Sequence, residues 1–308
     1  MPASTARVSL NRHLYEHAKV PDDLRHLILD IARAAKYIQR AIRTTEAGLA
    51  GAVNQFGEEQ QKLDVLSNDI IAQHLRESRR VATYVSEEED QIIELDAENP
   101  YSVVFDPLDG SSLVDANFAI GSIFGIYKGN AILGRRPKEQ SAALYVLYGP
   151  RTLLIYSAGN GVHEFILNDV GEFTLLRENL GIADKAKNFS PGNLSALEDN
   201  PGYKNNLNRW LDAKLTIRYS GCMVADVHHV ISKGQGVFTN VGGAKYPEGK
   251  LRLVFECGPF AYLASQAGGM ASSGIGDILD TVIETIDQRT PIIIGSSEEV
   301  KNTVDMLR

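Results

Sequence analysis

The sequence contains little cysteine and lacks any long apolar run. Only Cys222 and Cys257 occur in 308 residues, and they form no CxxC pair. This excludes a disulfide framework and a cysteine-based zinc site, so we interpret both thiols as small core residues. No apolar run reaches the roughly 18 residues of a membrane span, and no apolar secretion signal opens the chain. We therefore expect a cytoplasmic protein with no membrane partner; a plastid location of a mature chain stays open.

Positive charge is also scarce. The chain has 31 lysines and arginines against 39 aspartates and glutamates, which gives a formal net charge of −8. No block of basic residues and no basic–aromatic pattern offsets this balance, which argues against nucleic acid as the partner. An anionic ligand on so acidic a chain would need a metal ion to help hold it.

The composition is otherwise that of a globular protein long enough for two domains, with 44% hydrophobic and 23% charged residues. In the first half, apolar spacing predicts an amphipathic helix over residues 21–43 and a second helix over 65–78. Strands indicating a large, partly antiparallel sheet are expected over 80–86, 101–106, 122–129, 142–149, 151–159, 162–169 and 172–178.

A stretch rich in Gly, Pro, Asn and Ser at residues 188–202 separates two parts of the chain. Strands are expected after it over 214–221, 236–240, 250–256 and 291–295, and helices over 223–234, 258–269 and 297–308. The pattern predicts a mixed α+β and α/β fold. Its N-terminal α+β domain would span residues 1–185 and its C-terminal α/β domain residues 186–308.

Acidic residues recur at the ends of the predicted elements, namely at Asp64, Asp69, Glu87, Glu88, Glu89, Asp106, Asp109 and Glu256. Clustered carboxylates repel one another and need a cation, and Mg²⁺ or Mn²⁺ is held by oxygen ligands of this kind. Two such ions about 4 Å apart clamp a phosphoryl group and activate a water molecule. The acids therefore indicate metal-assisted phosphoryl chemistry.

The string DPLDGSS at residues 106–112 is the most specific signal in the sequence. Pro107 fixes the backbone, so that both aspartates and the Leu108 carbonyl can face one metal. Gly110 permits a tight turn, and the N–H groups of Gly110, Ser111 and Ser112 can receive phosphate oxygens at a helix N-terminus. An Asp-Gly pair alone is usually a turn, and an acidic run alone is usually a solvated loop.

Three motifs, SEEE, FDPLDGSS and FECGP, resemble the metal-dependent, lithium-sensitive sugar phosphatase superfamily. Longer stretches, among them QKLDVLSNDII, RYSGCMVADVHH and GKLRLVFECGPFAYLASQAGGMA, resemble its fructose-1,6-bisphosphatase and sedoheptulose-1,7-bisphosphatase family, from about Asp22 to the C-terminus. The resemblance implies a layered αβαβα fold and hydrolysis of the 1-phosphate of a sugar bisphosphate by direct attack of metal-activated water. It also implies a homodimer or homotetramer.

The resemblance assigns a role to each matching residue. Two or three Mg²⁺ ions, with Mn²⁺ as an alternative, would be held by Glu87, Asp106, Asp109, Glu256, the Leu108 carbonyl and Asp64. Asp69 and Glu88 would take the proton of the attacking water. The substrate would be bound by Gly110, Ser111, Ser112, Ser190, Asn193, Arg218, Tyr219, Asn240, Lys250 and Arg252. Arg218 would reach into a neighbouring subunit's site to hold the distal phosphate.

Three positions differ from those of fructose-1,6-bisphosphatases, and these differences concern the length of the substrate sugar. Ser190, Asn193 and Asn240 stand where fructose-1,6-bisphosphatases carry an amide and two tyrosines, which favours a sugar with one more carbon. We therefore predict sedoheptulose 1,7-bisphosphate as the substrate. The stretches MVADVH and ECGPFAY are closer to fructose-1,6-bisphosphatase, so that activity or dual specificity is the first alternative. A catalytically silent sugar-phosphate-binding protein is a remote one.

Overall fold

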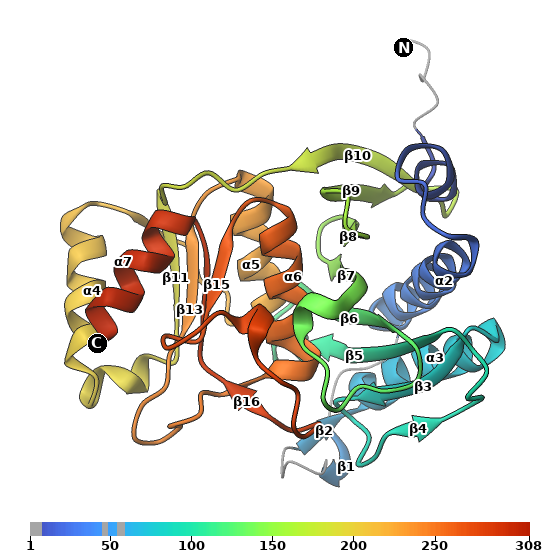
Figure 1. Cartoon of the computed structure of the whole chain (residues 1–308), viewed down its shortest axis with the longest axis horizontal. Coiled ribbons are helices and arrows are strands. Elements are labelled where there is room, and N and C mark those ends of the chain that lie inside the picture. Colours follow the sequence, from blue (N-terminus) through green and yellow to red (C-terminus); the bar gives the residue numbers. More distant parts are fainter. Residues whose placement is uncertain (1–7, 45–48, 54–58) are drawn as a thin grey trace.

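The structure is a computed structural model and describes residues 8–44, 49–53 and 59–308 (Figure 1). Its largest unit is an eight-stranded sheet in the order β10-β9-β8-β7-β6-β5-β3-β4, in which only β3 and β5 pair in parallel. Its strands are β3 (Val81–Ser86), β4 (Ile93–Glu94), β5 (Tyr101–Asp109), β6 (Ile120–Lys128), β7 (Gln140–Tyr148), β8 (Thr152–Ser157), β9 (Val162–Leu167) and β10 (Phe173–Leu180).

A second sheet of five strands follows, in the order β12-β11-β13-β17-β15. Its strands are β11 (Asn188–Gly192), β12 (Thr216–Ile217), β13 (Val237–Asn240), β15 (Met270–Ser272) and β17 (Ile292–Gly295). β11 pairs in parallel with β12 and β13, whereas β17 runs antiparallel to its neighbours. Two small two-stranded sheets join β1 (Leu49–Val53) to β2 (Glu59–Gln61) and β14 (Leu251–Arg252) to β16 (Arg289–Thr290).

The helices form three layers that alternate with the two sheets (Figure 1). α2 (Asp22–Thr44) and α3 (Lys62–Ser78) cover the outer face of the large sheet, α5 (Met223–Lys233) and α6 (Gly258–Gln266) fill the space between the sheets, and α4 (Pro201–Asp212) and α7 (Ser297–Leu307) cover the second sheet. A separate apolar cluster lies at each level, and the middle one joins both sheets. This arrangement confirms the layered αβαβα fold.

Two expectations about local structure are wrong. The apolar run 250–256 is not a strand: only Leu251–Arg252 pair as β14, and Leu253–Cys257 form a single π-helical turn, η5, that continues into α6. Similarly, the expected strand over 214–221 is reduced to the two residues of β12, Thr216–Ile217. Short apolar runs are compatible with strand or helix, and in the first case packing between the two sheets favours the helix.

Shorter helical turns complete the chain. They are α1 (Leu10–Arg12), η1 (His13–His17), η2 (Ser111–Leu113), η3 (Pro137–Glu139), η4 (Leu194–Glu198) and η6 (Ile278–Asp280). Because η2 is a 3₁₀ turn of three residues, the helix expected to follow DPLDG is shorter than a regular phosphate-binding helix.

Candidate active site

Three carboxylates meet between the two sheets. Asp106 and Asp109, at the end of β5, and Glu256, in η5, each offer an oxygen within 4.8 Å of the others. Asp106 and Glu256 are both 4% exposed. We refer to these three residues as the acidic centre.

The backbone of the DPLD segment explains this geometry. The pairing of β5 with β6 shifts register between Asp106 and Asp109, so the segment departs from the regular alternation of a strand. The N–H of Leu108 donates to Asp106 Oδ1 at 2.9 Å, and Ser122 Oγ donates to the Pro107 carbonyl at 2.7 Å. These bonds fix the bulge and the direction of the Asp106 side chain.

Gly110 ends the segment in a conformation that favours glycine. Its φ is +80°, and a Cβ at this position would lie 2.8 Å from Cys222 Cβ. The segment around Cys222 therefore packs directly against the turn. This close approach also brings the Cys222 thiol to Asp109.

Burial disfavours negative charge throughout the acidic centre. It raises the pKa of Glu256 to about 8, with the charge of Glu87 adding to the effect, and raises the pKa of Asp106 well above its usual value. Burial also raises the pKa of Asp109 to about 6, although hydrogen bonds from Cys222 and Val224 counteract it. A site of this kind favours a bound cation, and hard carboxylate oxygens suit Mg²⁺.

Arg252 supplies positive charge beside the acidic centre. Its guanidinium forms an ion pair with Glu87, which follows β3, and its backbone N–H donates to Glu256 Oε2 at 2.7 Å. The arginine side chain is 5% exposed. The sequence interpretation assigned Arg252 to the substrate phosphate and did not foresee this pairing with Glu87. Its role toward phosphate stays a prediction.

The segment from Ser220 into the first turn of α5 contacts Asp109, the third member of the acidic centre, and the sequence interpretation did not foresee these contacts. Asp109 Oδ2 accepts the N–H of Val224 at 2.6 Å and the thiol of Cys222 at 3.0 Å. Asp226 in turn accepts the N–H of Ser220 at 2.8 Å, which fixes the segment. Cys222 is thus more than a core residue, but no spacing in the sequence links it to Asp109.

α3 contributes two further predicted carboxylates, Asp64 and Asp69. Asp64 lies in the first turn of the helix and is 6% exposed, whereas Asp69 is exposed. Asn68 donates to Glu89 Oε1 at 2.9 Å and so connects α3 to the acidic run after β3. The pairing of Asp69 with Glu88 stays a prediction.

Four of the predicted substrate-binding residues lie near the ends of β11 and β13. Ser190 Oγ donates to the Arg218 carbonyl, and Asn193 Nδ2 donates to the Val241 carbonyl at 2.6 Å. Asn240 pairs in register with Gly192. We call Ser190, Asn193, Arg218 and Asn240 the distal cluster. Residues 218–224 run from this cluster to Asp109, so one segment connects it to the acidic centre.

The other predicted substrate residues are accessible to different degrees. Arg218, Tyr219 and Ser112 are exposed, and Ser111 is partly buried. The Lys250 ammonium lies 4.8 Å from the centre of the Tyr246 ring. A positive and an aromatic side chain, Arg218 and Tyr219, are therefore accessible at the distal cluster.

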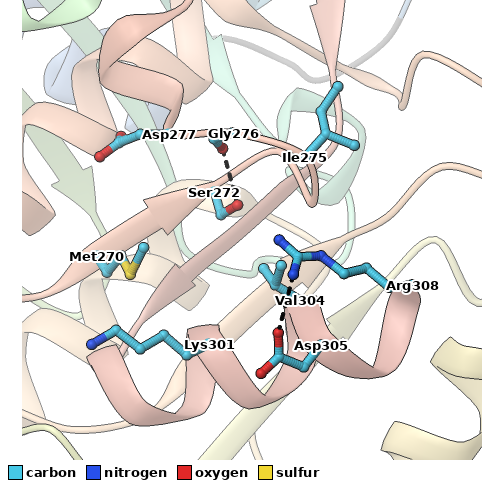
Figure 2. Close-up of a pocket in the computed structure, with 9 residues that line it drawn as sticks. All are labelled: Met270, Ser272, Ile275, Gly276, Asp277, Lys301, Val304, Asp305 and Arg308. Carbon is cyan, nitrogen blue, oxygen red and sulfur yellow. Dashed lines mark hydrogen bonds and ion pairs between the residues drawn. The ribbon is translucent and has the colours of Figure 1, made fainter.

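A separate pocket lies between β15 and α7 (Figure 2). Its charged groups come from Asp277, Lys301, Asp305 and Arg308, and the Arg308 guanidinium contacts Asp305 at 3.6 Å. None of the residues that line it belongs to the acidic centre or the distal cluster. The pocket is therefore not our candidate site.

Comparison with known proteins agrees with this geometry. The profile for the fructose-1,6-bisphosphatase N-terminal domain matches residues 5–178, and that for the C-terminal domain matches residues 182–308. The chain belongs to the class 1 fructose-1,6-bisphosphatase family. It is therefore a sugar bisphosphatase, a phosphoric monoester hydrolase.

Relatives within this family differ in their named substrate. A class 1 fructose-1,6-bisphosphatase of Syntrophotalea carbinolica is 44% identical over 98% of this chain and 94% of its own length. A chloroplastic sedoheptulose-1,7-bisphosphatase of Triticum aestivum is 38% identical over 97% of this chain and 77% of its own length. The crystal structure of Leishmania major fructose-1,6-bisphosphatase in holo form superimposes with a TM-score of 0.92 at 31% identity, covering 97% of this chain and 98% of that one.

Among residues 8–44, 49–53 and 59–308 of this fructose-1,6-bisphosphatase family member, none of the helices combines the length and the apolar character of a transmembrane span.

Proposed function

We propose that this protein hydrolyses the 1-phosphate of fructose 1,6-bisphosphate and accepts sedoheptulose 1,7-bisphosphate as a second substrate. The observation that carries the proposal is the acidic centre, with three carboxylates within 4.8 Å beside the Gly110 turn. Relatives that are 44% identical and named fructose-1,6-bisphosphatase support the six-carbon sugar over the seven-carbon sugar predicted from the sequence.

Mg²⁺ is the proposed cofactor, with Mn²⁺ as an alternative and two or three ions per site. The oxygens of the acidic centre, Glu87 and the Leu108 carbonyl would hold these ions, and Asp64 would face an additional one. When bound, the metal polarises the phosphoryl group and lowers the pKa of water. Arg252 already compensates part of the negative charge of Glu87. The bound metal would therefore mainly compensate the charge of the acidic centre.

Backbone and side-chain groups of the protein would bind the substrate and accept the proton of the attacking water. The turn at Gly110, Ser111 and Ser112 would hold the reacting phosphate through N–H and hydroxyl donors. Asp69 and Glu88 would take the proton as the water oxygen bonds to phosphorus. The bond from phosphorus to the sugar oxygen then breaks, and that oxygen takes up a proton.

Arg218 is proposed to act in the site of a neighbouring subunit of a homodimer or homotetramer. Its side chain is exposed, while its backbone N–H is fixed to the Phe189 carbonyl at 2.9 Å. Arg218→Ala alone should raise KM for the bisphosphate more than it lowers kcat, because the group binds a remote phosphate.

Mixed oligomers test this sharing of Arg218. Arg218→Ala subunits co-expressed with inactive Asp109→Asn subunits should recover activity at low substrate concentration. One site then combines an intact acidic centre with an intact arginine from its neighbour. Hybrids no more active than the separate variants would place Arg218 in its own subunit's site.

One observation makes Asn240 a candidate for contact with the sugar. Oδ1 of Asn240 is buried and has no hydrogen-bond partner within the described residues. A buried acceptor is costly unless it is satisfied, and a sugar hydroxyl can satisfy it. The hydroxyl of Ser190 and the amide of Asn193 are already used by backbone carbonyls, so Asn240 is the informative position.

Asn240→Tyr should therefore lower kcat/KM for sedoheptulose 1,7-bisphosphate about tenfold or more relative to fructose 1,6-bisphosphate. The tyrosine fills space and removes the free acceptor. The measurement is phosphate release from both sugars by the variant and by the parent protein. An unchanged ratio of the two kcat/KM values would show that Asn240 does not discriminate between the six-carbon and the seven-carbon sugar.

Phosphate release from the two bisphosphates with Mg²⁺, compared as kcat/KM, tests the proposal itself. We expect turnover of both, with the six-carbon sugar preferred. A tenfold preference for sedoheptulose 1,7-bisphosphate, about 1.4 kcal/mol of differential transition-state binding, would restore the seven-carbon prediction. Absence of turnover with both would contradict the proposal.

A further inference from the structure

A second cluster of metal-binding side chains lies far from the acidic centre in the fold. His13 in η1, His163 in β9 and Glu178 in β10 each offer a ligand atom within 4.8 Å of the others. His17, one helical turn after His13, stacks on it with ring centres 5.2 Å apart, and its Nδ1 lies 3.4 Å from Glu178 Oε1. The N-terminal helical segment lies here against β10 (Figure 1).

We propose that His13, His163 and Glu178 form a site for Zn²⁺ or a similar divalent transition metal, with His17 available as a fourth ligand. Imidazole nitrogens with one carboxylate suit zinc-class ions, whereas Mg²⁺ is held by oxygen ligands. This ion would therefore differ in kind from the one at the acidic centre. It would connect the N-terminal segment to two strands of the large sheet.

In each histidine, the ring nitrogen that would face away from the metal already has a hydrogen-bond partner. This is the usual arrangement of metal-binding histidines. His13 Nδ1 lies 2.7 Å from the hydroxyl of buried Tyr156, so the tautomer that donates to this oxygen leaves the Nε2 lone pair directed at Glu178, 2.9 Å away. His163 Nε2 donates to the Asn160 carbonyl at 3.1 Å, so Nδ1 carries the lone pair. This lone pair now accepts the N–H of Asn179 at 3.4 Å, a long contact that a metal bound at Nδ1 would replace.

The two imidazoles are buried and lie close together. His13 is 1% and His163 5% exposed, and their ring centres are 4.5 Å apart. Together with Glu178 they bring three potential ligand atoms from three separate elements to one point. A cation shared by the three side chains would be bound by all of them.

Zinc binding to the full chain tests the proposal. The protein is stripped with a chelator and kept in excess Mg²⁺ to occupy the acidic centre, and Zn²⁺ is then titrated in competition with a chromogenic chelator. Co²⁺ serves as a second probe, because its visible spectrum reports four-coordinate nitrogen and oxygen ligands. We expect one tight site per chain and, with Zn²⁺ bound, a higher melting temperature.

Two ligand variants and two controls separate this site from the acidic centre. Glu178→Gln and His163→Gln should weaken Zn²⁺ binding by more than about 100-fold and remove the Co²⁺ spectrum. Glu178 is 39% exposed, so its variant should fold even if the buried histidine variant does not. His26→Gln, on α2, and Asp109→Asn should bind Zn²⁺ as the parent protein does.

Two results would overturn the proposal. Equal affinity for Zn²⁺ in the parent protein and in Glu178→Gln would show that the cluster is not a ligand set. Loss of the tight site in Asp109→Asn, with retention in Glu178→Gln, would place the zinc at the acidic centre.

Discussion

Asp109→Asn should lower kcat by at least about a thousandfold while the fold persists. The carboxylate is one of the three in the acidic centre, and the change removes a negative charge that a bound metal requires. A metal contributes several kcal/mol to the stabilisation of transition-state charge, which is the scale of this loss. The asparagine oxygen can still accept the N–H of Val224, which now bonds Asp109 at 2.6 Å, so the local structure survives.

Phosphate release at saturating Mg²⁺ and thermal unfolding of the same preparation check this result. The matched control is Asp169→Asn, an identical chemical change at an exposed position between β9 and β10. Activity close to that of the parent protein in Asp109→Asn would refute the assignment of the acidic centre. A collapsed melting temperature would instead show that the carboxylate serves the fold.

Much of this architecture was predictable because its signals are local. The spacing of apolar residues placed a helix over 21–43, and the structure has α2 at Asp22–Thr44. In the segment DPLDG, the proline and the glycine restrict the backbone locally, so the sequence alone predicts that the two aspartates lie close together. The structure places them in one cluster. Periodicity and turn residues act within a few positions, so they can be read directly from the chain.

The unpredicted features depend on contacts between distant residues. Cys222 and Asp109 are separated by 113 positions, and Arg252 and Glu87 by 165. Glu256 was expected at the end of a strand, but it lies in the π-helical turn η5. An apolar run is compatible with a strand or a helix, and here the packing between the two sheets favours the helical turn. Tertiary packing therefore places one member of the acidic centre and its two neighbours, Cys222 and Arg252.

Arg252→Met should destabilise the metal-free protein by about 3–5 kcal/mol, because it removes the positive charge that is paired with Glu87 in a largely buried site. Methionine retains much of the apolar volume, so the loss reports mainly the charge. Added Mg²⁺ should recover part of the loss, since a cation at the neighbouring carboxylates compensates the same negative charge. Urea unfolding with a chelator and with Mg²⁺ measures both effects.

The control is Arg12→Met, which breaks an exposed ion pair with Glu16 and should cost at most about 1 kcal/mol. The double variant Arg252→Met with Glu87→Gln removes both charges, and it should be more stable than Arg252→Met alone. If the double variant is no more stable, the cost of the single change is not due to the loss of the ion pair with Glu87. A restored free energy of unfolding would show that Arg252 supplies the positive charge that lets these carboxylates stay close together before a metal binds.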